Sequence, residues 1–305
     1  MAEFFLTVAV CTHNHLDALR QTLRNIHQLG PPHVGWEFLV VDNSSTDGTA
    51  SWLADNNWQR QDVESRVVHE PALGVAHARN RALKESRADY VLFLDDDETP
   101  DPDWLSEMTG VLQQRQPVAA GGRIRAAISG TKPSWLSEEL LGFLGELDYG
   151  NQMSRLTDSS TPIFTGNAAF HKTTTVNLGG FDINLGRRGK QQTGGEDTEL
   201  YRRIIAKNME VVWVPNAIIH HRIEPWKLRR GYFLDLHFRQ GRIEGARTRG
   251  SASRLPPKYL IPQVARAYTR ALATRLGDGV DHSLRLEMNA AYFTGYLVGW
   301  MRDSA

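Results

Sequence analysis

Uninterrupted apolar runs alternate with helical repeats along residues 1–120. The runs are rich in β-branched and aromatic residues, as in strands buried on both faces, and between them apolar residues recur every three or four positions. The predicted strands are residues 6–11, 38–41, 67–68 and 90–94, and the predicted helices are residues 16–26, 50–54, 74–86 and 104–114. This alternation predicts an α/β sheet.

The remainder of the chain is less regular and then becomes helical. Gly, Ser and Thr are frequent between residues 118 and 214, where a helix is predicted at 197–207 and short strands at 209–214 and 217–219. From Pro225 onward the pattern is helical, with Pro256-Pro257 separating two helices and a last helix near residues 283–301. No internal repeat and no low-complexity segment interrupts this order.

Charge is unevenly distributed, although 35 Lys and Arg balance 35 Asp and Glu. Residues 222–275 hold 13 basic and 3 acidic residues, a local charge of +10, whereas residues 1–221 carry −8. Within this basic segment, arginines at 229, 230, 239, 242, 247 and 249 lie among Tyr232, Phe233, Leu236 and Phe238 and resemble a basic amphipathic surface, which predicts contact with anionic lipid or an anionic acceptor. A helical extension with a solvated basic face is the alternative. Nucleic acid is not expected as a partner, because no motif for it accompanies the charge.

Several classes of protein are disfavoured. A single cysteine, Cys11, excludes an internal disulfide framework and a Cys-rich zinc site. No apolar run approaches the roughly 20 residues of a membrane span, and no signal peptide is evident. We therefore expect a cytoplasmic protein, with peripheral contact at the inner face of the membrane left open. P-loop, dinucleotide-turn and serine-elbow motifs are missing as well.

Polar residues follow three predicted strands where the strands end. They are Thr12-His13-Asn14, Asp42-Asn43 and Asp95-Asp96-Asp97-Glu98. Ligands of open α/β sheets bind beyond these strand ends. The adjacent carboxylates suit a divalent cation on diphosphate oxygens or a solvated loop, and Asp42 suits a ribose hydroxyl or an Asx-turn.

Two further motifs open predicted helices. Residues 74–80 begin with a glycine, and Arg79 among them could reach a phosphate or clamp a carboxylate. The carboxylates of residues 194–197 could cap a helix or supply a general base. At most one of His220 and His221 is expected to ligate a metal, because neighbours in a strand face opposite ways.

Together these motifs resemble those of inverting family 2 glycosyltransferases of the bacterial polysaccharide type, which have the GT-A fold. They follow the family's order across residues 5–221. The matching pieces are Val10-Cys11-Thr12-His13-Asn14, residues 42–49, residues 74–80, Asp95-Asp96-Asp97, Gly166-Asn167 and Gly195-Glu196-Asp197. The family usually has Tyr where His13 stands and often Gly where Ala82 stands.

The resemblance implies a GT-A fold: a mixed, mostly parallel sheet flanked by helices. Residues 1–221 would form the catalytic domain, with a nucleotide-sugar half near 1–120 and an acceptor half near 121–221, and residues 222–305 a basic helical extension. It further implies a hexosyltransferase-like enzyme that uses a nucleotide-diphospho-sugar, a UDP-sugar being favoured, and Mn²⁺ or Mg²⁺. The acceptor would be a sugar or a lipid-linked molecule in polysaccharide or glycoconjugate assembly.

The resemblance also implies roles for single residues. Asp197 would be the general base, with Glu196 beside it, and Asp97 would bind the metal with help from His221. The donor nucleotide would be held by Thr12, Asn14, Asp42, Arg79, Asp95 and Asp96. The acceptor and sugar cleft would include Gly166, Asn167 and Gly195.

Two other functions remain open. A sugar-1-phosphate nucleotidyltransferase shares the donor chemistry, but it normally has a Gly-rich basic loop after the first strand, and residues 12–19 contain none. A non-catalytic nucleotide-sugar-binding protein is the second alternative. The presence of both Asp97 and Asp197 argues against it.

Overall fold

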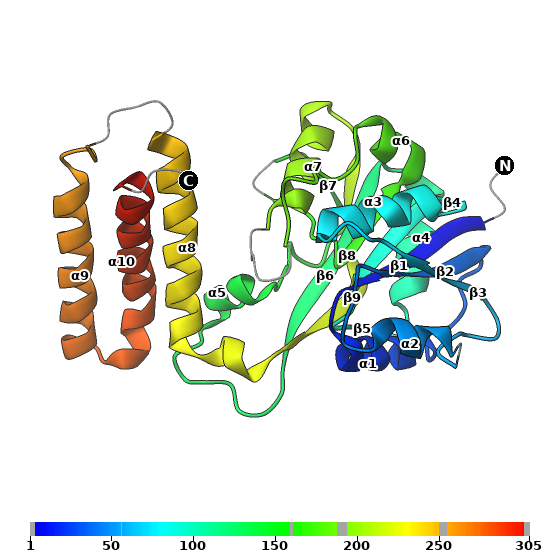
Figure 1. Cartoon of the computed structure of the whole chain (residues 1–305), viewed down its shortest axis with the longest axis horizontal. Helices are drawn as coiled ribbons and strands as arrows, with labels where there is room; N and C mark the ends of the chain where they lie inside the picture. Colours follow the sequence, from blue (N-terminus) through cyan, green and yellow to red (C-terminus); the bar gives the residue numbers. More distant parts are fainter. Residues whose placement is uncertain (1–3, 56, 159–160, 188–193, 250–254, 302–305) are drawn as a thin grey trace. The chain divides into compact units, whose positions relative to one another are not determined.

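The computed structural model describes residues 4–55, 57–158, 161–187, 194–249 and 255–301 (Figure 1). The chain divides into a sheet unit, residues 1–125 and 146–222, and a helical unit, residues 126–145 and 223–305. Residues 126–145 were assigned to the acceptor half by the sequence. They instead cluster with the C-terminal helices, because apolar residues such as Leu140 and Leu144 join the core of the helical unit.

The parallel part of the sheet contains the strands that the apolar runs predict. These are β1 (Phe4–Thr12), β2 (Trp36–Asp42), β3 (Glu64–His69) and β4 (Ala88–Asp95). Strand β1 lies between β2 and β4, and β3 pairs with β2, all in parallel. Every residue of β2 is buried, which explains its continuous apolar run.

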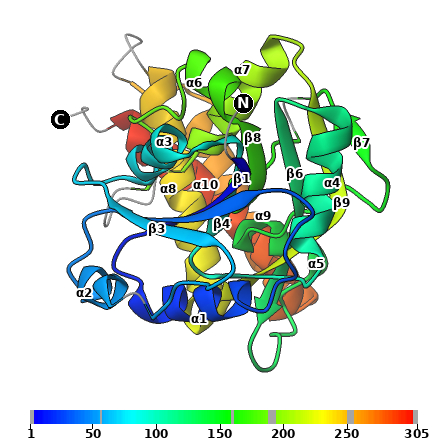
Figure 2. The same cartoon turned by 90° about the vertical axis from the view of Figure 1, so that its right-hand side faces the viewer.

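Helices connect these parallel strands and cover both faces of the sheet. They are α1 (Leu16–Ile26), α2 (Thr49–Ala54) and α3 (Val75–Glu85). In both views α1 and α2 lie on one side of the parallel strands and α3 lies on the other (Figure 2). The carboxyl ends of β1, β2 and β4 therefore meet at one edge of the sheet, where the polar loops begin.

Antiparallel strands extend the sheet beyond β4. The order of the whole sheet is β3-β2-β1-β4-β8-β6-β9-β5, and β7 also pairs with β9. They are β5 (Glu98–Pro100), β6 (Ala119–Ile128), β7 (Ser154–Leu156), β8 (Asn167–His171) and β9 (Val211–Ile223). The flanking helices are α4 (Trp104–Arg115), α6 (Lys172–Asn177) and α7 (Glu196–Ala206). Buried aromatic residues such as Trp104, Phe93 and Phe170 fill the core of the sheet unit.

Strand β9 is continuous, although the sequence predicts two strands broken near Pro215. The stretch paired with β7 ends at Trp213, and the stretch paired with β5 begins at Ile219. Pro215 lies between these stretches, so its missing N–H interrupts neither ladder. The uninterrupted strand carries His220 and His221 back to the end of β4.

The helical unit contains three long helices. They are α8 (Arg230–Arg249), α9 (Leu260–Gly277) and α10 (Val280–Met301), with short turns α5 (Glu138–Leu141), η1 (Gly142–Leu144) and η2 (Pro225–Leu228). Helix α10 packs between α8 and α9 (Figure 1). Glycines let α8 and α10 approach closely, since a Cβ at Gly245 would lie 2.1 Å from the carbonyl oxygen of Tyr296. Within the described residues, no helix is both long and apolar enough to cross a membrane.

Candidate active site

The loops after β1 and β4 are joined by side-chain hydrogen bonds. Thr12 donates its hydroxyl to one carboxylate oxygen of Asp96 at 2.6 Å, and Nδ1 of His15 lies 2.9 Å from the other. Asp96 therefore anchors the acidic turn to the loop after β1. Thr12 and Asp96, which were both predicted to bind the donor nucleotide, thus lie side by side. Their side chains are hydrogen-bonded to each other.

The loops after β1 and β2 are joined in the same way. Asn14 has a left-handed φ of 51° and accepts the backbone N–H of Thr46 at 2.6 Å. Asp42 is 2% exposed and accepts the N–H of Ser45 at 3.2 Å, while its second oxygen lies 3.5 Å from Nδ1 of His69. The bond to Ser45 closes a turn three residues on, rather than the two of an Asx-turn, and donor binding by Asp42 and Asn14 stays a prediction.

Glu98 closes the acidic turn that begins at Asp95. Its buried carboxylate accepts the backbone N–H of Asp95 at 2.9 Å. Burial, followed by the charges of Asp95 and Asp97, raises the pKa of Glu98. A Cβ at Gly166 would lie 2.4 Å from Oε1 of Glu98, so this carboxylate explains why glycine stands at position 166.

Arg222, the last residue of the sheet unit, holds the same turn from β9. Its backbone N–H donates to the carbonyl oxygen of Asp97 at 3.0 Å. Its guanidinium donates to the carbonyl oxygens of Ala18, Asp96 and Glu98 and to the hydroxyls of Thr22 and Thr99. The backbone of the turn that carries Asp97 is therefore tied to both α1 and β9. From the sequence, Arg222 was counted only within the basic segment and was assigned no role in the site.

His221 and Asp97 converge because of the register between β5 and β9. Glu98 pairs with His221 across this ladder, and Nε2 of His221 lies 3.4 Å from a carboxylate oxygen of Asp97. His220 instead meets Asp101 at 2.8 Å, as alternation along a strand requires.

The Asp97–His221 pair has donor atoms that suit a divalent cation. In the described part of the chain, no group of three or more His, Cys, Asp or Glu side chains could form a complete metal cage. A carboxylate and an imidazole can nevertheless hold Mn²⁺ or Mg²⁺ when diphosphate oxygens and water complete the shell. The residues present fit a cation that is shared with a diphosphate.

Arg79 joins the end of β4 to the start of α7. Its guanidinium donates to Glu196 at 2.5 Å and to Asp95 at 3.2 Å, and it is 5% exposed. Burial opposes the charge, but the carboxylates of Asp95, Glu196 and Asp197 outweigh it and raise the pKa of Arg79. Of the two possibilities considered from the sequence, the structure shows the carboxylate clamp.

The two carboxylate oxygens of Glu196 differ in their partners. Its Oε1 binds Arg79, whereas Oε2 is buried and has no hydrogen-bond partner among the described residues. A buried carboxylate oxygen is costly to leave unpaired. This oxygen is enclosed by the protein, so a contact between Glu196 and a ligand hydroxyl stays a prediction.

Asp197 lies in the first turn of α7, next to this cluster. The turn starts at Gly195, whose φ of 107° favours glycine. The Asp197 carboxylate accepts the backbone N–H of Thr198 at 2.7 Å. Burial, then the neighbouring Glu196, raise the pKa of Asp197 despite the opposing charge of Arg79. A raised pKa makes this carboxylate a stronger base.

Asn167 is buried inside the sheet unit. Its side chain is 1% exposed, both of its amide hydrogens donate to the carbonyls of Arg123 and Ala217, and its oxygen accepts from Trp104. These contacts join β8 to β6, β9 and α4. Asn167 thus holds the sheet together with both amide hydrogens in use, and its place in the acceptor and sugar cleft stays a prediction.

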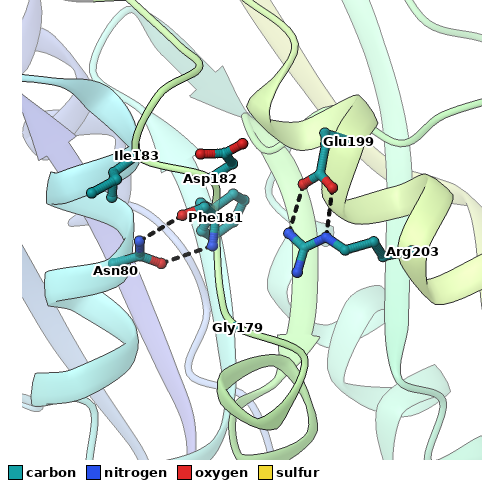
Figure 3. Close-up of a pocket in the computed structure, with 7 residues that line it drawn as sticks. All are labelled: Asn80, Gly179, Phe181, Asp182, Ile183, Glu199 and Arg203. Atoms are coloured by element: carbon teal, nitrogen blue, oxygen red, sulfur yellow. Dashed lines mark hydrogen bonds and ion pairs between the residues drawn. The ribbon is translucent and has the colours of Figure 1, made fainter.

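A separate hollow of about 390 Å³ lies on the sheet unit and contains none of the predicted site residues (Figure 3). Asn80 of α3 bonds the backbone of Phe181 there, and Glu199 and Arg203 of α7 pair at 2.7 Å. Arg203 also donates to the carbonyls of Leu178 and Gly180. The polar groups of this hollow thus hold a loop between α3 and α7.

Comparison with known proteins identifies the family. Residues 7–177 match the model of glycosyl transferase family 2, and residues 146–225 match that of the N-terminal domain of galactosyltransferase. Since the first match covers more than half of the chain, the protein belongs to glycosyl transferase family 2. It is therefore a glycosyltransferase, as the motifs indicated.

Named relatives and solved structures agree with this family. Succinoglycan biosynthesis protein ExoM of Rhizobium meliloti is 25% identical over 79% of this chain and 74% of its own. The glucosyl-dolichyl phosphate glucuronosyltransferase of Haloferax volcanii is 22% identical over 77% and 75%. The structure of mannosyltransferase PcManGT from Pyrobaculum calidifontis, with GDP-Man and Mn²⁺, has a TM-score of 0.64 at 19% identity over 97% of this chain and 87% of that one. These likenesses confirm the predicted GT-A fold.

Proposed function

We propose that the protein is a metal-dependent, inverting glycosyltransferase that moves a sugar from a nucleotide-diphospho-sugar to an acceptor hydroxyl. The observation that carries this proposal is the arrangement of the Asp97–His221 pair and the Arg79–Glu196–Asp197 cluster around the end of β4. A UDP-sugar is the favoured donor. The Mn²⁺ in the structures of PcManGT with GDP-Man and of GalNAc-T7 with UDP supports the choice of cation.

The chemistry proposed for these residues is a single displacement. A cation held by Asp97 and His221 would neutralise the negative charge of the leaving diphosphate. Asp197 accepts the proton of the acceptor hydroxyl, whose oxygen forms the new bond to the anomeric carbon as the bond to the diphosphate breaks. Attack from the face opposite the leaving group inverts the configuration at that carbon.

The other residues of the site would orient the two substrates. Arg79 fixes Asp95 and Glu196 relative to one another, and Glu196 would contact the acceptor or the sugar. Asp42 and the loop after β1 would contact the base and ribose. Holding the reacting groups in place in this way can supply much of a rate enhancement.

The names of the relatives support a role in glycan assembly. They include a succinoglycan biosynthesis protein, a glucosyl-dolichyl phosphate glucuronosyltransferase and a putative teichuronic acid biosynthesis glycosyltransferase. We propose a sugar or lipid-linked acceptor on these grounds. Membership of the transferase family disfavours both the nucleotidyltransferase and the non-catalytic alternative.

A donor screen by thermal shift tests the proposal. With Mn²⁺ present, at least one nucleotide-diphospho-sugar is expected to raise the melting temperature, since a ligand at 100 times its Kd stabilises by about 2.7 kcal/mol. The same donor with EDTA should give a much smaller shift, and slow release of free sugar should accompany binding. The proposal fails if no nucleotide sugar with Mn²⁺ shifts the transition or is hydrolysed.

Arg222→Gln is expected to weaken Mn²⁺ binding without removing a ligand. The variant loses the hydrogen bonds that fix the turn carrying Asp97, and loss of such supporting contacts typically costs about 10- to 100-fold in metal affinity. We therefore expect the Mn²⁺ concentration for half-maximal transfer to rise by at least about tenfold, with the rate recovering at saturating Mn²⁺. Titration of activity with Mn²⁺ measures this.

Arg66→Gln is the matched control, because Arg66 is another part-buried arginine of the sheet unit that joins separate elements, through the carboxylate of Glu37 on β2 and the carbonyl oxygen of Glu85. It should lower the melting temperature without changing the Mn²⁺ requirement. Arg222→Lys should restore part of the Mn²⁺ affinity. An unchanged Mn²⁺ requirement in Arg222→Gln would remove the positioning role.

A further inference from the structure

Helix α9 presents an apolar stripe that its own unit does not cover. Ile261, Tyr268, Leu272 and Leu276 are spaced at seven, four and four residues, so they share one side of the helix, and their exposed fractions lie between 52% and 78%. Leu260 and Ala271, on a different side, are buried. The helix thus has one apolar side that is used in packing and a second that is not.

The charge of α9 is wholly positive. Between residues 260 and 277 it carries Arg266, Arg270 and Arg275 and no acidic residue. Arg275 pairs with Glu287 of α10 at 3.1 Å. Arg266 and Arg270 are exposed as well, on a side of α9 away from the apolar stripe, and the described residues provide no ion pair for either. An exposed apolar stripe on a helix that also carries these two arginines matches a surface that is apolar inside and anionic outside.

Helix α8, where the sequence placed the basic amphipathic surface, has a different character. Phe233 is fully buried in the core of the helical unit. Arg230 binds Glu287, Arg239 pairs with Asp235, and Arg247 pairs with Glu244. Much of the charge on α8 is therefore neutralised in place, and one of its aromatic residues is already used for packing.

We propose that α9 rests on a membrane surface that contains anionic lipid. Ile261, Leu272 and Leu276 would enter the boundary between headgroups and acyl chains, where interfacial helices bury their apolar side. Tyr268, whose hydroxyl accepts a hydrogen bond from Thr294 of α10 at 3.2 Å, would lie with its half-exposed ring at headgroup depth, and the arginines would meet lipid phosphates. A second copy of the chain is a poorer occupant, because two such stripes would bring unpaired arginines together. The proposal does not depend on sugar transfer.

Vesicle sedimentation with the full chain tests the proposal. The protein should bind vesicles of 70% phosphatidylcholine and 30% phosphatidylglycerol much more than pure phosphatidylcholine, and salt should weaken binding. The double substitution Leu272→Ser and Leu276→Ser should lower the partition coefficient by at least about tenfold, since it removes two large apolar side chains. Arg266→Gln with Arg270→Gln should lower it by about fivefold per arginine for the anionic vesicles alone.

Exposed residues elsewhere supply the controls. Met153→Ser and Val176→Ser alter apolar side chains of the sheet unit with similar exposure, and Arg239→Gln removes a paired arginine of α8; none should change vesicle binding. Circular dichroism should show unchanged helix content in each variant. Equal binding to both vesicle types, or unaltered binding of the double Ser variant, would overturn the proposal. So would a dimer, seen by sedimentation velocity, that the Ser substitutions dissociate.

Discussion

Asp197→Asn is expected to lower the rate of sugar transfer by about 10²- to 10⁴-fold, which is the range that a positioned general base contributes. Asn keeps the size and shape of the side chain, and its oxygen can still accept the N–H of Thr198 that Asp197 accepts at 2.7 Å. The start of α7 and the donor site should therefore persist. Initial rates with the donor found by the screen, together with calorimetric donor affinity, separate the two effects.

The pH profile supplies a second readout for Asp197. Burial and Glu196 raise the pKa of this carboxyl above the ordinary value of 3.8, and a base acts only in its deprotonated form. In the native enzyme kcat/KM should therefore fall as pH is lowered through a value higher than that of an ordinary aspartate. The residual activity of Asp197→Asn should lack that limb.

Glu199→Gln is the matched control, because Glu199 lies in the same first turn of α7 but pairs with Arg203. It should transfer sugar at close to the native rate. Native-like turnover in Asp197→Asn would exclude Asp197 as the base. Lost donor affinity in that variant would instead indicate a structural role.

The parallel part of the fold could be predicted because its signals are local. Strand β1 is an apolar run, and α1 repeats apolar residues at helical spacing, so each element can be recognised from its own residues. Strands β5 and β7 have three residues each and form only when β9 lies beside them. Their pairing depends on residues that are distant in the chain, so it cannot be predicted from a short stretch of sequence.

The same difference divides the site residues. The ends of β1, β2 and β4 had to meet at one edge, so their polar loops could be grouped from the sequence. The support that Arg222 gives to Asp97 depends on the register of β5 with β9, which sequence does not specify. The inward direction of the Asn167 side chain could not be predicted, because a motif gives the identity of a residue but not the direction of its side chain.

To distinguish a buried from an exposed apolar face on α8 and α9, the burial of the side chains is needed as well as the sequence pattern. Aromatic residues among arginines made α8 look amphipathic, but Phe233 packs inside the helical unit. Helix α9 has a comparable composition with its apolar stripe left exposed. Only the packing of α8 and α9 against α10 distinguishes a core face from a free one.

Asp97→Ala is expected to abolish the stimulation of nucleotide-diphosphate binding by Mn²⁺. Without metal, the Asp97 carboxylate repels a diphosphate, so the metal-free affinity should stay the same or improve slightly. With Mn²⁺, His221 alone holds the cation poorly and the affinity should fall by at least about tenfold. The ratio of Kd values measured by calorimetry with Mn²⁺ and with EDTA should approach one.

Asp101→Ala is a close control, because Asp101 and His220 form a similar pair 2.8 Å apart on the same two chain segments. It should leave the ratio unchanged, and an unchanged ratio in Asp97→Ala would exclude Asp97 from the metal site. A double-mutant cycle adds a sharper criterion. If Asp97 and His221 hold one ion, removing both should cost little more than removing Asp97, because residues that share a ligand are not additive. Additive losses would mean that the two side chains act separately.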